Sequence, residues 1–167
     1  MILEISLEYI WSPWRMEYII GDKQKDVCVF CNELNKTDGL DNLIVARFRF
    51  SCVILNRYPY TSGHIMVVPF EHLSSLEELD PETLNEMMAV TAKAIKVLRK
   101  IYEPQGFNVG VNIGEAAGAG IQDHVHMHIV PRWEGDTNFM FTLGKTRVLP
   151  ETLEDSYSRI THEWKKY

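Results

Sequence analysis

Apolar and polar positions follow one another along much of the chain in the patterns of β-strands. Short runs rich in β-branched and apolar residues predict strands at 43–46, 50–55 and 65–69, with turn residues before the third run. Strict alternation of apolar and polar residues predicts two more strands, at 107–113 and 125–131. The chain therefore carries the pattern of a sheet of about five strands.

One long helix is predicted between the third and fourth strands. Asp80 and Pro81 are a typical helix start, and Pro104 and Gly106 should end the helix. Apolar residues then recur at three- and four-residue spacings, which predicts one buried stripe. The stripe consists of Leu84, Met87, Met88, Thr91, Ala94, Ile95, Leu98 and Ile101. We expect both methionines to lie in the core, and Glu86, Lys93, Lys96 and Lys100 to face water.

The order of strands, long helix and further strands predicts an α+β fold with an antiparallel sheet. With 167 residues and 46% hydrophobic content, the chain can form one core but is short for two. It has no internal repeat and no linker long enough to separate domains, so residues 1–167 are expected to form a single domain. The polar stretch 23–41 is expected to be a loop.

The charge and the cysteine content indicate which binding partners and which cellular compartment to expect. The 17 Lys and Arg against 23 Asp and Glu give a net charge of -6, which disfavours binding to nucleic acid or to an anionic membrane. The start lacks the basic region of a signal peptide, and no apolar run could span a bilayer. We expect a cytoplasmic protein. Of its three cysteines, Cys28 and Cys31 have a spacing that favours metal or redox chemistry in a reducing compartment, and Cys52 is expected to be buried in a strand.

Three of the six histidines stand at alternate positions of the last predicted strand: His124, His126 and His128. Residues at i, i+2 and i+4 share one face of a strand, so the imidazoles should line up while the residues between them face the other side. A surface strand with incidental histidines is one alternative. A single metal bound by all three is another, but the outer two lie about 13 Å apart on a strand, too far for one ion.

A run of small residues, 112–120, lies just before the histidines. Glycine and alanine let backbone N–H groups approach an anion closely, although such a stretch can also be a plain loop. Next to a row of imidazoles, it supplies anion donors beside a nucleophile. The combination indicates chemistry at phosphorus.

At this point the residues resemble a known family. The pattern His-x-His-x-His followed by apolar residues, with Asn-Arg-Tyr-Pro (56–59) and Gly-His-Ile-Met-Val-Val-Pro (63–69) upstream, resembles the histidine-triad (HIT) nucleotide hydrolases and transferases. The resemblance covers roughly 28–132, and the residues that follow it are similar to the branch related to diadenosine-tetraphosphate hydrolases and phosphorylases. It implies a HIT-like fold with a core at about 28–139 and a homodimer whose sheet continues across the interface.

The resemblance also implies site residues. His126 matches the nucleophile that attacks the α-phosphorus and forms a nucleotidyl-histidine intermediate, and His128 matches the residue that orients it and contacts phosphate. The other matched positions are Asn56 for the ribose, Asn112 near the scissile phosphate, and a phosphate loop of Gly118, Ala119, Gly120 and Ile121. Many members have Gln or Ser in this loop. Here Ala119, Gly120 and one extra residue stand in its place, so backbone donors would replace that side chain.

The same resemblance bears on metal binding. Two thiolates two residues apart can occupy two vertices of a tetrahedral zinc site, and two further ligands are needed. His72 and His124 are the candidates, and the matching positions of metal-containing HIT relatives form a structural Cys2His2 zinc site. A free, metal-free cysteine pair is the alternative.

The leading functional interpretation is an enzyme that attacks the α-phosphate of a dinucleoside polyphosphate and passes the nucleotidyl group to water or phosphate. A purine nucleoside phosphoramidase would share every residue named. A zinc-stabilised nucleotide-binding module without catalysis is an alternative of another class.

Overall fold

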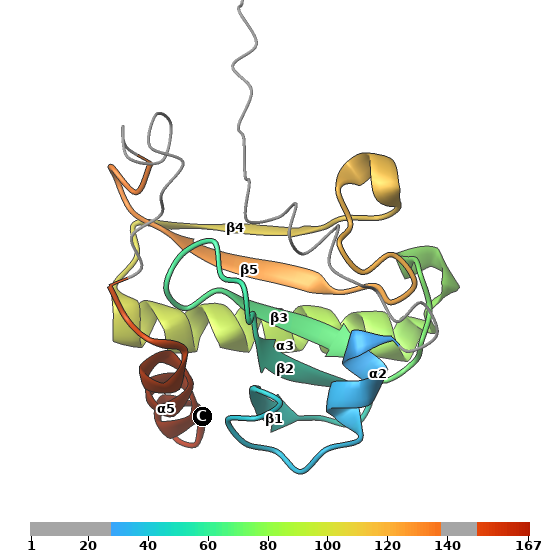
Figure 1. The fold of residues 1–167 in the computed structure, drawn as a ribbon, viewed down its shortest axis with the longest axis horizontal. Helices are drawn as coiled ribbons and strands as arrows, with labels where there is room; N and C mark the ends of the chain where they lie inside the picture. Colours follow the sequence, from blue (N-terminus) through green and yellow to red (C-terminus); the bar gives the residue numbers. More distant parts are fainter. Residues whose placement is uncertain (1–27, 138–149) are drawn as a thin grey trace, which may run out of the picture.

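The computed structural model describes residues 28–137 and 150–167, which contain a five-stranded antiparallel sheet in the order β1-β2-β3-β5-β4 (Figure 1). The strands are β1 (Ile44–Arg47), β2 (Ser51–Leu55), β3 (Ile65–Pro69), β4 (Gly106–Val111) and β5 (Met127–Arg132). The α-helices are α2 (Val29–Leu34), α3 (Pro81–Tyr102) and α5 (Leu153–Trp164), and two short 3-10 helices span Leu76–Glu78 and Glu115–Ala117. The predicted α+β class and antiparallel sheet are confirmed.

One face of the sheet packs against α3, and the other face carries a pocket. Met127 and Ile129 of β5 are buried on the face covered by α3, where the Thr91 hydroxyl contacts the Met127 sulfur at 3.2 Å. His128 lies between them and therefore points to the opposite face. It is paired with Met66 of β3, which in turn is paired with Ile54 of β2. This opposite face carries the pocket described below.

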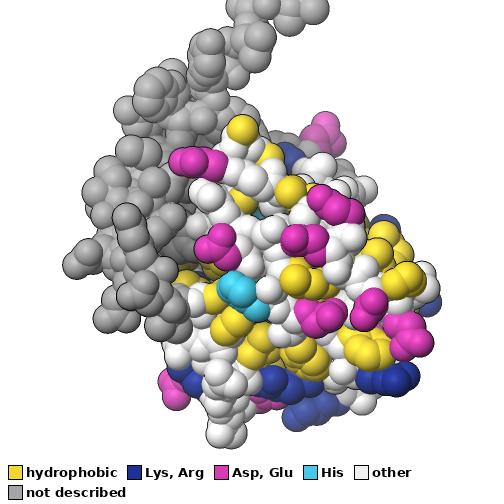
Figure 2. All heavy atoms as spheres, turned by 90° about the vertical axis from the view of Figure 1, so that its right-hand side faces the viewer, with side chains coloured by type: hydrophobic (Ala, Val, Ile, Leu, Met, Phe, Trp, Pro, Cys, Tyr) yellow, Lys and Arg dark blue, Asp and Glu magenta, His cyan; other side chains and the backbone are white. Residues whose placement is uncertain are grey.

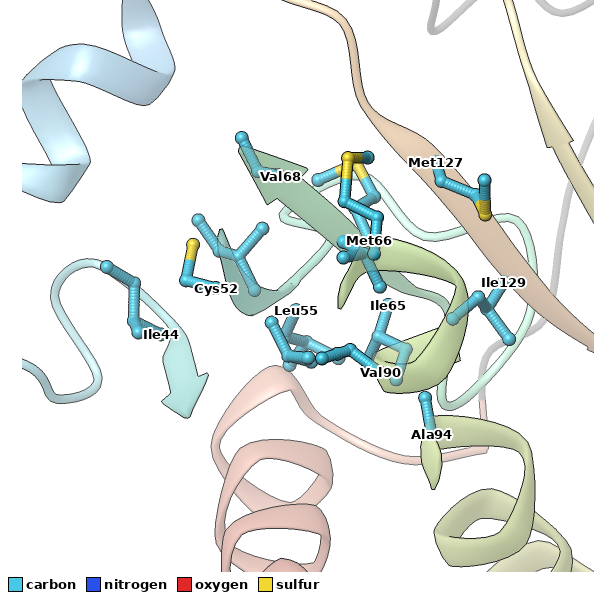
Figure 3. Packing of buried hydrophobic residues seen from close by; sticks show 14 of the residues in the cluster. Ile44, Cys52, Leu55, Ile65, Met66, Val68, Val90, Ala94, Met127 and Ile129 are labelled. Atoms are coloured by element: carbon cyan, nitrogen blue, oxygen red, sulfur yellow. The ribbon is translucent and has the colours of Figure 1, made fainter. Parts of the chain in front are cut away.

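The core lies between the sheet and α3. Ile65 and Ile129 are fully buried and are paired across β3 and β5. Figure 3 shows them beside Val90 and Ala94 of the helix. All residues of β2 and β3 are buried, which is why these strands read as continuous apolar runs in the sequence.

Several local expectations need correction. The stretch 23–41 was expected to be a loop, yet it contains α2, and α5 was not predicted at all. Met87 is buried as expected, but Met88 is 58% exposed because it lies outside the stripe that faces the sheet. Asp80 precedes α3 as predicted without making a side-chain capping hydrogen bond.

Two charged residues of α3 do more than face water. The half-buried Glu86 carboxylate accepts hydrogen bonds from the backbone N–H groups of Arg49 and Phe50, so it closes the turn between β1 and β2. Lys93 lies over the ring of Trp164 with its ammonium 5.3 Å from the ring centroid, which ties α5 to α3. Lys96 and Lys100 are exposed as predicted.

The strand β4 forms one edge of the sheet and pairs only with β5 among the described strands. Its predicted apolar face is incompletely covered: Phe107 and Val111 pack against the core, whereas Val109 is 43% exposed and Ile113, just beyond the strand, is 42% exposed. Across the described ranges, no helix combines the length and apolar character needed to cross a membrane.

Gly63 precedes β3 at a position that only glycine fits. Its φ is +75°, and a Cβ built there would lie 2.6 Å from a ring carbon of Tyr102. We expect Gly63→Ala to lower the free energy of unfolding by about 2 kcal/mol or more, because the substitution adds both backbone strain and a steric clash. Urea denaturation measures this directly, and Gly39→Ala is the control, because Gly39 has no neighbouring atom in the way. Equal loss in both variants would contradict the assignment.

Candidate active site

A pocket lies on the sheet face opposite α3, walled by α2 and by the loop that precedes β5. His126 and His128 lie at one end, and Asn112, Gly120 and Ile121 line it nearby. Asn56 also lines the pocket, and its Oδ1 accepts a hydrogen bond from the N–H of Tyr58. The structure therefore brings together most of the residues that the sequence nominated for nucleotide binding.

Two members of the expected phosphate loop lie differently. Gly118 and Ala119 are not among the residues that line the pocket. Their backbone N–H groups donate to Glu115 and Gly114 within the loop, at 2.8 and 3.3 Å. The φ of +80° at Gly118 ends the short 3-10 helix and turns the chain toward Gly120. These two residues shape the loop, and Gly120 and Ile121 present it to the pocket.

His126 is held in one orientation by its neighbours. Its Nδ1 donates a hydrogen bond to the backbone carbonyl of His124 at 2.8 Å, so the proton lies on Nδ1 and Nε2 keeps its lone pair. The ring packs against Phe30 of α2 and against His128, with centroid distances of 4.9 and 4.8 Å. The side chain is only 4% exposed, and this burial lowers the pKa of His126. The arrangement presents a neutral imidazole nitrogen, which is the nucleophilic form.

The alternation of histidines predicted one strand carrying all three. The structure differs, because β5 begins at Met127 and only His128 lies within it. His124 and His126 precede the strand and are both buried. His124 belongs to a different cluster, so the three side chains divide between two sites.

His64 is a third histidine at the active site, beside His126 and His128, and its role was not predicted. It is fully buried just before β3, and its Nδ1 accepts a hydrogen bond from the backbone N–H of Tyr60 at 3.1 Å. Its proton therefore lies on Nε2, which donates to Nδ1 of His128 at 3.0 Å. This bond places the His128 proton on Nε2 and holds the ring in position. His64 belongs to the quoted Gly-His motif, but its contact with His128 spans 64 residues and leaves no local pattern.

We expect His64→Ala to lower kcat by about 10- to 100-fold, because His128 loses the donor that sets its tautomer. KM should change much less, since His64 lies behind His128. Steady-state kinetics on a nucleotide substrate measures both constants, with His162→Ala as the control because His162 is exposed on α5. A change confined to KM would contradict a positioning role.

The four predicted metal ligands meet beside the pocket. Their ligand atoms lie within 4.8 Å of one another, and they come from Cys28, Cys31, His72 and His124. Nδ1 of His124 is 3.4 and 3.6 Å from the two sulfurs, and Nδ1 of His72 is 3.3 Å from the Cys31 sulfur. A tetrahedral zinc ion holds sulfur and nitrogen ligands about 3.5 Å apart, so the distances fit.

The hydrogen bonds around the cluster fit a metal as well. Nε2 of His124 donates to the carbonyl oxygen of Pro69 at 2.9 Å, which leaves Nδ1 unprotonated toward the two sulfurs. Burial and the neighbouring Cys28 raise the pKa of the Cys31 thiol, and a bound cation would reverse that effect. The donor set of two sulfurs and two imidazoles suits zinc and has no open position for water.

The fold and this site define a class of protein. The HIT domain matches residues 39–135, which is more than half of the chain, and the chain belongs to the HIT family. It is 38% identical over 166 residues to the AP-4-A phosphorylase of Mycobacterium tuberculosis, covering 95% of this chain and 85% of that protein. It is also 31% identical over 90 residues to the asymmetrical bis(5'-nucleosyl)-tetraphosphatase of Schizosaccharomyces pombe, covering 54% of this chain and 49% of the relative.

Solved structures give the same family. A Zn-bound histidine-triad protein from Mycobacterium smegmatis superimposes with a TM-score of 0.67 at 28% identity, covering 83% of this chain and 94% of the other. A hypothetical histidine-triad nucleotide-binding protein from Sulfolobus tokodaii gives a TM-score of 0.67 at 30% identity, covering 83% of this chain and 93% of the other. The expected HIT fold is thereby confirmed.

Proposed function

We propose that this chain cleaves dinucleoside polyphosphates at an α-phosphorus through a covalent intermediate on His126. The observation that carries the proposal is the hydrogen bond from His126 Nδ1 to the carbonyl of His124, which leaves the Nε2 lone pair for attack inside the pocket. The two named relatives, a phosphorylase and a tetraphosphatase, act on such substrates according to their names and support this choice.

The reaction has two balanced steps. Nε2 of His126 forms a bond to the α-phosphorus, and the bond from that phosphorus to the bridging oxygen breaks, so the remaining polyphosphate leaves with the electron pair. Nε2–H of His128 donates a hydrogen bond to a phosphate oxygen and stabilises its negative charge. Water or inorganic phosphate then attacks the same phosphorus, and the P–N bond breaks to restore His126. Asn56 would hold the ribose, while Asn112, Gly120 and Ile121 would face the phosphates.

The test is product identification with diadenosine tetraphosphate, with and without inorganic phosphate. Attack at the α-phosphorus yields ATP plus ADP when phosphate is the acceptor, and ATP plus AMP when water is. Two molecules of ADP in the absence of phosphate would contradict attack at the α-phosphorus. Adenosine 5'-phosphoramidate as a parallel substrate distinguishes the phosphoramidase alternative, since its cleavage releases ammonia.

We further propose that the Cys2His2 cluster holds one structural zinc ion. Its ligands would be Cys28, Cys31, His72 and His124, and their spacing supports this. The ion would tie α2 to the segment that precedes β5. The ion would take no part in the reaction at phosphorus, which we assign to the residues of the pocket.

We propose a homodimer in which the edge strand β4 and the long helix α3 of two copies meet. The exposed Val109 and Ile113 support this, because β4 pairs only with β5 among the described strands and exposed apolar side chains at such an edge favour covering by another chain. Light scattering should give twice the chain mass of 19.4 kDa, and the mass of one chain at micromolar concentration would contradict the proposal. A single domain over 1–167 and a cytoplasmic location also remain part of the proposal.

A further inference from the structure

The pocket runs across the sheet from the histidines toward β1. Its lining residues include His128 on β5, Met66 on β3, Ile54 on β2 and Leu43, the residue before β1. Neighbouring strands lie about 4.8 Å apart, so β1 and β5 are separated by about 14 Å across the sheet. The end near β5 is polar and carries the imidazoles. The end near β1 is lined by apolar side chains such as Leu43 and Ile54, which suit the flat face of a base, and also by the polar Asn42.

The helix α2 walls the pocket along this direction. Its first turn lies at the histidine end, where Phe30 contacts the ring of His126. Its last turn lies near β1, where the side chain of Asn42 donates to the carbonyl oxygen of Glu33 at 3.1 Å and Arg47 donates to that of Leu34. Glu33, which also lines the pocket, is therefore placed at the end away from the imidazoles.

The Glu33 carboxylate has one oxygen in an ion pair and one with no partner among residues 28–137 and 150–167. Oε1 forms an ion pair with Lys36 at 2.7 Å, whereas Oε2 is buried and makes no hydrogen bond with any residue that the structure describes. The side chain as a whole is 13% exposed. A buried carboxylate oxygen without a donor is costly, and a ligand that brings a donor would relieve that cost.

The chemistry of a nucleotide identifies that donor. A carboxylate repels phosphate, so Oε2 must meet a neutral donor remote from the phosphates. The exocyclic amino group of a base is such a donor. Asn42, which also lines the pocket, cannot take this role with its oxygen, because Oδ1 already accepts from the N–H groups of Gly39 and Ile44. Figure 2 shows the side of the molecule on which α2 lies, where acidic and hydrophobic side chains intermingle and Lys and Arg gather at the lower edge.

We propose that Glu33 determines base specificity by accepting a hydrogen bond from the exocyclic amino group of the bound base. The inference rests on the proposed function, because it takes the pocket to hold a nucleotide with its phosphates at the histidines. It assigns a substrate class: nucleotides whose base carries an amino group, adenine among them. Lys36 keeps Oε1 occupied and so leaves a single oxygen for recognition.

The experiment compares the dissociation constants of two 5'-monophosphates by calorimetry, using protein purified without chelators. AMP carries the amino group, and purine riboside 5'-monophosphate lacks it. The wild-type protein should bind AMP about tenfold more tightly, as expected for a hydrogen bond to a charged acceptor. In Glu33→Met this ratio should fall to within about twofold, and Glu33→Gln, which keeps an acceptor oxygen, should retain part of it. Asn32→Ala is the matched control, since Asn32 is an exposed residue of α2 outside the pocket lining.

Four results would overturn the inference, and the last of them would overturn the proposed function as well. Equal binding of the two nucleotides by the wild-type protein would do so while leaving the proposed function intact, and so would an unchanged ratio in Glu33→Met. A third arm uses 2'-deoxy-AMP: if Glu33→Met removed only the preference for AMP over this ligand, Glu33 would contact the ribose and not the base. If the wild-type protein bound none of these nucleotides, the proposed function itself would also be wrong.

Discussion

His126→Ala should lower the turnover of diadenosine tetraphosphate by more than about a thousandfold, because the variant lacks the only group assigned to form the bond to phosphorus. Nucleotide binding should persist, since Asn56, Asn112 and the apolar end of the pocket remain. Initial rates measured by chromatography of the products, together with the dissociation constant for AMP, test both statements.

Two companion variants sharpen this test. His162→Ala should keep wild-type turnover, because His162 is exposed on α5 and lies away from the triad. His126→Gly opens space for added imidazole, and recovery of turnover with imidazole would show that the missing group is the nucleophile. Near-normal turnover of His126→Ala would mean that another residue attacks the phosphorus.

Loss of the metal cluster should have the largest effect on stability. We expect Cys28→Ser to reduce bound zinc from about one ion per chain to a small fraction, and to lower the melting temperature by roughly 10 °C, since metal binding adds directly to folding free energy. Chelation of the wild-type protein should lower the melting temperature before it changes the rate of the chemical step. Elemental analysis and thermal denaturation give the two readouts.

The control for this prediction is Cys52→Ala. Cys52 is a buried residue of β2 and is not one of the four residues of the cluster. Burial raises the pKa of its thiol to about 12, so the thiol remains protonated. Its replacement can destabilise the core but should leave the zinc content unchanged. Wild-type protein with far less than one zinc per chain, or Cys28→Ser with unchanged metal content and stability, would rule out the structural zinc.

Regular elements that bury an apolar stripe were predictable from the sequence. The helix α3 and the strand β3 have the expected bounds, because long periodic segments carry the strongest signal. The six-residue α2 escaped prediction since it buries a single residue, Phe30, and owes its conformation to tertiary contacts. The helix α5 did leave a signal, because Leu153, Tyr157, Ile160 and Trp164 recur at helical spacing after the capping residue Thr152.

The parts of the candidate site that are formed by residues close together in the sequence were predictable. The spacing of His126 and His128 indicated a shared face, and the cysteine pair indicated a metal cluster. His64 and Glu33 were missed because their significance comes from contacts and burial that only the folded chain creates. The sequence pattern alone did not separate His124 from the other two histidines. Only the resemblance to metal-containing HIT proteins assigned His124 to the metal cluster.

The register in which β5 pairs with β3 determines whether His128 points into the pocket. Side chains alternate between the two faces, so a slip of one residue would turn His128 into the core and expose Ile129 in the pocket. Such a slip would also remove Met127 and Ile129 from beneath α3, at a cost of about 1.5 to 3 kcal/mol for each side chain. Met127 and Ile129, the apolar neighbours of His128, thus select the correct strand alignment: only chains with a correctly aligned β5 gain the stability of the full core.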